Sequence, residues 1–162
     1  MGSTLTDSMG GPTQTVLTMQ HLPATMVLGY YAGLAATYPW EEEKIGLFGA
    51  GRVHREPVGV VAALIPWNVP FFIACNKLAP ALIAGCSVIL TPAPETPLDA
   101  NLLAEWLTEA GLPEGLLSVL PAGREVGEYL INHPGVDKVT FAASTAAGPR
   151  VGALPSERPK GG

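Results

Sequence analysis

The chain has 162 residues, of which 48% are hydrophobic and 14% are charged, and its formal net charge at pH 7 is -5. This length and composition are typical of one globular domain with its own core and exclude a disordered chain. The negative charge and the few, scattered basic residues argue against nucleic acid or an anionic membrane surface as a partner.

We also expect no membrane span and no signal peptide. Pro66, Asn68 and Pro70 interrupt the longest apolar stretch, so it does not reach the roughly 18 to 20 residues that cross a bilayer. The N-terminus lacks the basic start and apolar run of a signal peptide, which predicts a cytoplasmic protein. Cys75 and Cys86 form neither a CxxC pair nor a series of metal-ligand spacings, so we expect two small buried hydrophobic residues and no metal site.

Residues 1–21 are expected to form a loose N-terminal segment. From residue 22 to 38, apolar residues recur at helical spacing until Pro39, which predicts an amphipathic helix. The glycine-rich stretch GLFGAG then follows the glutamates at 41–43 and leads into Arg52. A dinucleotide-binding loop must instead follow a strand and open a helix. We therefore expect a turn or hairpin here, with the glutamates on a solvated face.

The stretch from Arg55 to Pro70 reads REPVGVVAALIPWNVP. Its apolar run from Val58 to Ile65 is rich in β-branched residues, as in a strand that is buried on both faces. Pro66 and Pro70 disfavour helix for the residue before each of them, so Asn68 is expected on a constrained loop at the carboxyl end of the strand. In open α/β sheets, ligands bind at that edge.

Helices and strands then alternate as far as residue 141. The sequence predicts helices over 71–84, 98–110 and 125–132, the first two ended by Gly85 and Gly111, and strands over 86–90, 116–120 and 136–141. A proline-punctuated loop, TPAPETP, occupies residues 91–97. This alternation indicates right-handed βαβ units. The predicted fold class is α/β, with a partial doubly wound, Rossmann-like parallel sheet that a helix and a hairpin segment precede.

The segment after the last predicted strand reads AASTAAGPR and covers residues 142–150. Ser144 or Thr145 could cap a helix there and offer its free N–H groups to an anion. Most serine and threonine caps bind nothing, so the residues alone leave both interpretations open.

Four motifs occur in an order that resembles the aldehyde dehydrogenase superfamily. They are REPVGVVAALIPWNVP, NKLAPALIAGCSVILTPAPETPL, EAGLPEGLLSVLPAG and HPGVDKVTFAAST. The resemblance implies part of an NAD(P)-binding domain over residues 22–153, followed by a tail at 154–162 that does not resemble the family. It also implies oxidation of an aldehyde through a thiohemiacetal on a cysteine, hydride transfer to the nicotinamide, and hydrolysis by a glutamate-activated water.

The resemblance also implies roles for individual residues. Asn68 is the expected side-chain donor of the oxyanion hole, because its amide would meet the aldehyde oxygen as negative charge develops. The residues expected to bind NAD or NADP are Ile65, Pro66 and Trp67 at the nicotinamide and its ribose, Thr91 and Ala93 at the adenosine ribose, Ala122 near the adenine, and Ala143, Ser144 and Gly148 at the pyrophosphate.

Three of these positions depart from the family pattern. Thr91 stands where the family usually has a lysine that bonds the ribose hydroxyls, so that contact is lost. Ala122 and Ala143 replace glycines, and a β-carbon at either place hinders a close backbone approach. We therefore expect weak or absent cofactor binding.

In the family, the general-base glutamate and the nucleophilic cysteine come after a Gly-Ser turn, which Ala143 and Ser144 match here. Neither of their motifs is found in these 162 residues. Two hypotheses result. Either the chain is a truncated aldehyde dehydrogenase that acts only with a second polypeptide carrying the catalytic half, or it is a catalytically inactive remnant or interaction module. An incomplete sheet leaves an unpaired edge, so we also expect self-association or a homo-oligomer.

Overall fold

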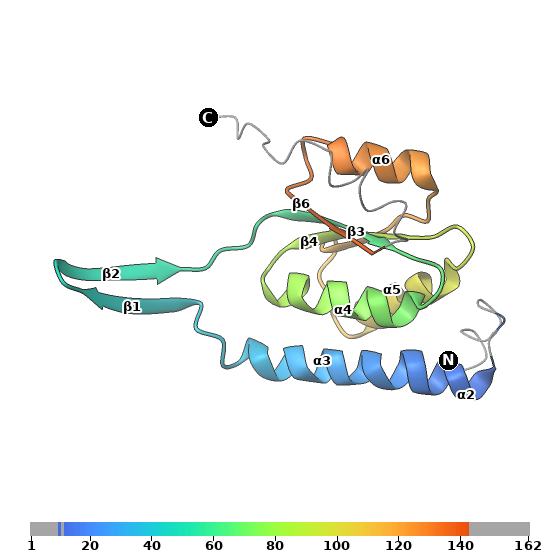
Figure 1. Ribbon diagram of the computed structural model, residues 1–162, viewed down its shortest axis with the longest axis horizontal. Coiled ribbons are helices and arrows are strands. Elements are labelled where there is room, and N and C mark those ends of the chain that lie inside the picture. The colour runs from blue at the N-terminus through green and yellow to red at the C-terminus, as the bar shows by residue number, and fades with distance from the viewer. Residues whose placement is uncertain (1–9, 11, 143–162) are drawn as a thin grey trace.

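The computed structural model describes Gly10 and residues 12–142, and it shows stacked layers of helix and sheet (Figure 1). In chain order the elements are α2 (Thr13–Val16), the π-helix η1 (Leu17–His21), α3 (Leu22–Ala35), β1 (Glu41–Gly46), β2 (Gly49–His54), β3 (Val60–Ile65), α4 (Pro70–Ile83), β4 (Ser87–Pro92), α5 (Leu98–Glu109), β5 (Leu117–Val119), α6 (Arg124–Asn132) and β6 (Lys138–Phe141). The predicted α/β class, with a helix and a hairpin before the sheet, is confirmed.

The main sheet has four parallel strands in the order β5-β4-β3-β6. The chain moves outward from β3 through β4 to β5 and then returns to place β6 on the other side of β3. The boundary between β3 and β6 is therefore the topological switch point, beside which open α/β sheets bind their ligands.

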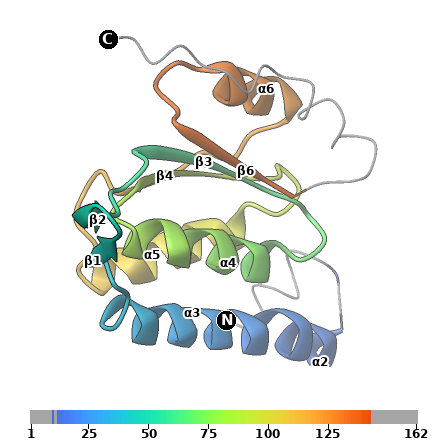
Figure 2. The same cartoon turned by 60° about the vertical axis from the view of Figure 1, so that its left-hand side comes forward.

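Helices cover both faces of this sheet, as both views show (Figure 2). α4 and α5 lie on one face, α6 lies on the other, and α3 packs on the outer side of α4. The larger core cluster joins β3 and β4 to α4 and α5, and includes Leu78, Leu90 and Leu103. A smaller cluster under α6 contains Ala62, Leu130 and Val136.

Two glycines beside the main sheet have positive φ angles that other residues rarely adopt. Gly59, just before β3, has φ +110°, and an added Cβ would meet the carboxylate of Asp137. That carboxylate accepts the N–H of Val60 at 2.8 Å, which ties the start of β3 to the residue before β6. Gly85 has φ +77° and follows Ala84, the C-cap residue of α4, as predicted for a helix-ending glycine.

The N-terminal expectations need two corrections. Residues 13–21, which we expected to be loose, form α2 and η1, because Val16 joins the core and the Gln20 side chain accepts the N–H of Phe71 at 3.1 Å. The helix predicted over 22–38 ends at Ala35 and is not amphipathic. Of its residues only Ala24 is fully buried, and large apolar side chains such as Met26 and Tyr30 are exposed.

The GLFGAG stretch forms a hairpin, as predicted. β1 and β2 pair antiparallel from Glu41 opposite His54 to Gly46 opposite Gly49. The hairpin projects away from the sheet and its helices (Figure 1).

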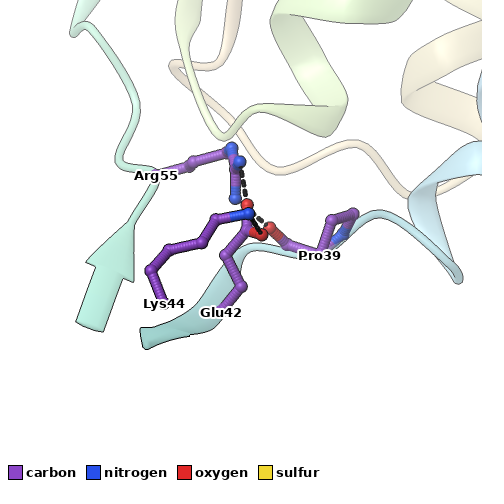
Figure 3. Close-up of polar contacts among 4 residues, drawn as sticks. All are labelled: Pro39, Glu42, Lys44 and Arg55. Atoms are coloured by element: carbon purple, nitrogen blue, oxygen red, sulfur yellow. Dashed lines mark hydrogen bonds and ion pairs between the residues drawn. The ribbon is translucent and has the colours of Figure 1, made fainter. Parts of the chain in front are cut away.

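At the base of this hairpin, the Arg55 guanidinium donates to the carbonyl of Pro39 at 2.6 Å and pairs with Glu42 (Figure 3). Hydrogen bonds from Lys44 and Arg55 lower the pKa of Glu42. Glu42 is therefore a partner in a polar cluster rather than part of a solvated face, which corrects that expectation. Its neighbours Glu41 and Glu43 are exposed.

Three polar side chains near the end of β4 are buried without a hydrogen-bond partner. The hydroxyls of Thr91 and Thr96 and both carboxylate oxygens of Asp99 lack one, and each residue is at most 3% exposed. Burial raises the pKa of Asp99 from 3.8 to about 6. The ionised form of this carboxyl group therefore opposes folding.

The pH dependence of the free energy of unfolding should show the effect of burying the Asp99 carboxyl group. Its pKa is higher in the folded than in the unfolded chain, so the folded state binds more protons between about pH 4 and 6 and stability falls as the pH rises through that window. We expect Asp99→Asn to raise the free energy of unfolding at pH 7 by about 2 kcal/mol and to flatten this fall. Urea denaturation at pH 4, 5, 6 and 7 measures both. The matched control is Glu109→Gln, at an exposed position of the same helix; equal pH profiles for Asp99→Asn and the original chain would contradict the expectation.

Candidate functional site

The carboxyl ends of β3, β4 and β5 meet at one edge of the sheet, and backbone hydrogen bonds hold the loops that leave them. The N–H of Ala93 donates to the carbonyl of Ile65 at 3.1 Å, and the N–H of Ala122 donates to the carbonyl of Pro92 at 3.3 Å. Three regions that the sequence predicts to face the cofactor therefore lie along one edge: the end of β3, the loop after β4 and the loop after β5.

Asn68 lies on the loop between β3 and α4, as predicted. Ile65 ends the strand at 5% exposure, Pro70 opens the helix, and Trp67 on the loop between them is 65% exposed. The Asn68 Oδ1 atom accepts the N–H of Val69 at 3.0 Å. This bond leaves the amide nitrogen of Asn68 free to donate, since no partner for it is found among residues 12–142. An exposed amide donor at the ligand edge of the sheet fits stabilisation of a developing oxyanion.

Thr91 differs from its expected position. We predicted it at the start of a loop, but β4 continues to Pro92 because Leu64 and Ile65 of β3 pair with Thr91 and Pro92. Thr91 is 3% exposed and its hydroxyl has no partner. Ala93 is in the loop, as predicted, and Ala122 lies in the loop before α6. The other three predicted cofactor residues, Ala143, Ser144 and Gly148, lie outside the described residues.

The sequence did not reveal the role of Lys77, although it is the only charged residue of α4. Its ammonium group donates to the carbonyl of Leu64 at 2.6 Å and to the carbonyl of Thr140 at 3.0 Å. These atoms belong to β3 and β6, the two strands at the switch point. Burial lowers the pKa of Lys77 to about 8. A lone charge on an otherwise apolar helix was the signal that could have identified it.

Neither cysteine has the environment of a nucleophile. Cys75 and Cys86 are 0% and 3% exposed and belong to the larger core cluster. Burial raises the pKa of the Cys75 thiol to about 12, so the reactive thiolate is not formed near neutral pH. This confirms the expectation that both cysteines are small buried hydrophobic residues.

A concavity of about 530 Å³ lies away from this edge. Its lining residues come from the end of α6 and the turn before β6, and are Glu128, Tyr129, Asn132, His133 and Pro134. That turn is at the amino-terminal edge of the parallel sheet, opposite the loops that carry Asn68 and Ala93. The concavity is open, and its residues take no part in the site predicted from the sequence.

We expected the nicotinamide at the loop after β3 and the adenosine ribose at the end of β4, and these two places offer different chemical groups. The loop after β3 offers an exposed tryptophan and an amide donor, which suit an aromatic ring and a reacting carbonyl oxygen. The end of β4 offers no ammonium group and a threonine hydroxyl that is buried. An adenosine ribose would therefore lack a charged anchor there.

Known proteins resemble this chain in sequence and in fold. Residues 2–160 match the family model described as "Aldehyde dehydrogenase family". The chain is 49% identical over 123 residues to geranial dehydrogenase of Castellaniella defragrans, covering 75% of this chain and 26% of that protein. It is 42% identical over 134 residues to an aldehyde dehydrogenase of Enchytraeus buchholzi, covering 78% and 26%. The chain thus spans about a quarter of the length of these relatives.

Solved structures resemble this one over 93% of the chain. An aldehyde dehydrogenase of Mycobacterium tuberculosis complexed with NAD+ has a TM-score of 0.89 and 48% sequence identity, and the match covers 31% of that chain. An NAD+ complex of aldehyde dehydrogenase from Bacillus cereus has a TM-score of 0.85 and 32% identity, and again 31% of that chain is covered. With its sequence and its fold both matched, this chain belongs to the aldehyde dehydrogenase family.

Proposed function

We propose that this chain supplies the cofactor-facing part of a site that oxidises aldehydes with NAD or NADP. The observation that carries the proposal is the position of Asn68, whose amide is exposed at the ligand edge of the sheet and beside its switch point. In this role the amide N–H of Asn68 donates to the aldehyde oxygen as negative charge develops on it. The preceding residues, Pro66 and Trp67, border the nicotinamide.

We further propose that these 162 residues do not oxidise aldehydes alone. The two buried cysteines cannot serve as the nucleophile, and oxyanion stabilisation does not replace one. A second polypeptide would then have to supply the nucleophile and the general base. The alternative is a catalytically inactive interaction module, which the exposed apolar hairpin favours. No helix among the described residues is long and apolar enough to cross a membrane; location in the cytoplasm stays a prediction.

The purified chain should show no aldehyde dehydrogenase activity. With short and long aliphatic aldehydes and either cofactor, the absorbance of the reduced nicotinamide should not rise above the rate without protein. A full-length aldehyde dehydrogenase in the same assay is the positive control. Turnover that survives Cys75→Ser and Cys86→Ser would show that another nucleophile is present, and turnover lost in either variant would show that a buried cysteine reacts. Both results would contradict the proposal.

Thr91 should limit affinity for the cofactor. We expect isothermal titration with NAD to give a dissociation constant weaker than micromolar, and Thr91→Lys to tighten it about tenfold by restoring an ammonium group near the ribose. Pro94→Lys, which adds the same charge at an exposed position of the same loop, is the matched control. Micromolar binding by the original chain would contradict the first expectation. Equal gains from both lysines would attribute the effect to net charge alone.

Self-association is the third part of the proposal. Ile45, Leu47 and Phe48 at the tip of the hairpin are 88%, 93% and 99% exposed, and large apolar side chains exposed this close together in the chain favour contact with another copy. Sedimentation velocity should show concentration-dependent association that the double change Leu47→Ser and Phe48→Ser reduces. Leu98→Ser, at a 51% exposed position on α5, should leave it unchanged. A monomer at all concentrations would refute this part.

A further inference from the structure

Lys77 occupies the boundary between β3 and β6. Open α/β sheets form a ligand crevice at such a switch point, because the connections leave the two neighbouring strands in opposite directions. No connecting loop joins these two strand ends directly. The carbonyls at the carboxyl ends of parallel strands also concentrate partial negative charge. An ammonium group that contacts one carbonyl from each strand therefore meets two needs: it satisfies acceptors at the end of the sheet and joins two elements that lack a local connection.

Lys77 also links the two ends of the loop that carries Asn68, because it lies on the helix after the loop and bonds to the strand before it. The chain leaves β3 after Leu64 and Ile65, passes through Pro66–Val69, enters α4 at Pro70 and reaches Lys77 two turns later. There the side chain bonds back to the carbonyl of Leu64 at 2.6 Å. The base of the loop is thus fixed to the helix that follows it.

We propose that Lys77 is a positioning residue that fixes the end of β3 against β6 and thereby holds the Asn68 loop at the switch point. None of the hydrogen bonds of Lys77 is to Asn68, so Lys77 acts on the loop through the backbone of β3. The ammonium form makes these two hydrogen bonds charge-assisted, and with a pKa of about 8 it predominates at pH 7. This inference rests on the proposed function in one respect, the role of Asn68 as the oxyanion donor.

Two backbone amides report the position of the loop. The N–H of Val69 donates to the Asn68 side chain, and the N–H of Ala93 donates to the carbonyl of Ile65, the residue after Leu64. Hydrogen exchange of both can be followed by nuclear magnetic resonance in the intact 162-residue chain, without a cofactor. The amides of Val88 and Leu90, in the buried strand β4, report global opening in the same experiment.

In Lys77→Met we expect exchange at Val69 and Ala93 to accelerate at least about tenfold more than exchange at Val88 and Leu90, because two charge-assisted hydrogen bonds are lost. Lys138→Met, which removes an exposed charge from β6, is the matched control and should leave the ratio unchanged. Lys77→Gln keeps a single amide group and should give an intermediate ratio. If Lys77→Met does not fold, the ratio of exchange rates in Lys77→Gln tests the proposal in its place.

An equal acceleration at all four amides would assign Lys77 a role in stability only and would overturn the proposal, as would unchanged exchange at Val69 and Ala93. The same local loosening in Lys138→Met would attribute the effect to net charge and also overturn it. Where the original chain binds NAD measurably, Lys77→Met should weaken that binding and Lys138→Met should not. Local loosening without a change in NAD affinity would support the positioning of the loop and count against its proposed function.

Discussion

The burial of β3 on both faces is the constraint on which the rest of the fold depends. Val61, Ala62 and Ala63 are 4%, 0% and 0% exposed. Because successive strand residues point to opposite faces, Val61, Ala63 and Ile65 enter the cluster under α4 and α5, while Ala62 enters the cluster under α6. A strand without polar alternation needs apolar cover on each side, and the layers of helices supply it.

The same strand determines where the candidate site is. Its last buried residue, Ile65, is only three residues from the exposed Asn68, so the loop has little freedom. Two prolines flank that loop, and α4 starts directly at the second. The candidate oxyanion donor is therefore held by a strand end and a helix start rather than by a long flexible segment, which suits a group that must be oriented before reaction.

Most of the sheet and its helices could be predicted from sequence because their residues show the periodicity of a buried strand or of a covered helix. The start of α2 could not, since residues 13–21 owe their helical form to packing of Val16 and Gln20 against distant residues. The pairing of Glu42 with Arg55 likewise depends on the register of the hairpin. Asp99 was missed because polar residues in the first turn of a helix are usually exposed, whereas this one is 2% exposed.

Thr91 shows why the family of a chain can be inferred from its sequence more safely than the binding of a ligand by a single residue. In the proposed site, a residue at the end of β4 has two tasks: it pairs with Leu64 of β3, and its side chain meets the cofactor. Threonine is β-branched and suits the first task as well as a longer side chain does. It does not suit the second, because its hydroxyl is buried and has no hydrogen-bond partner. β4 therefore keeps its pairing and the fold matches that of its relatives, whereas the proposed contact with the cofactor would be missing.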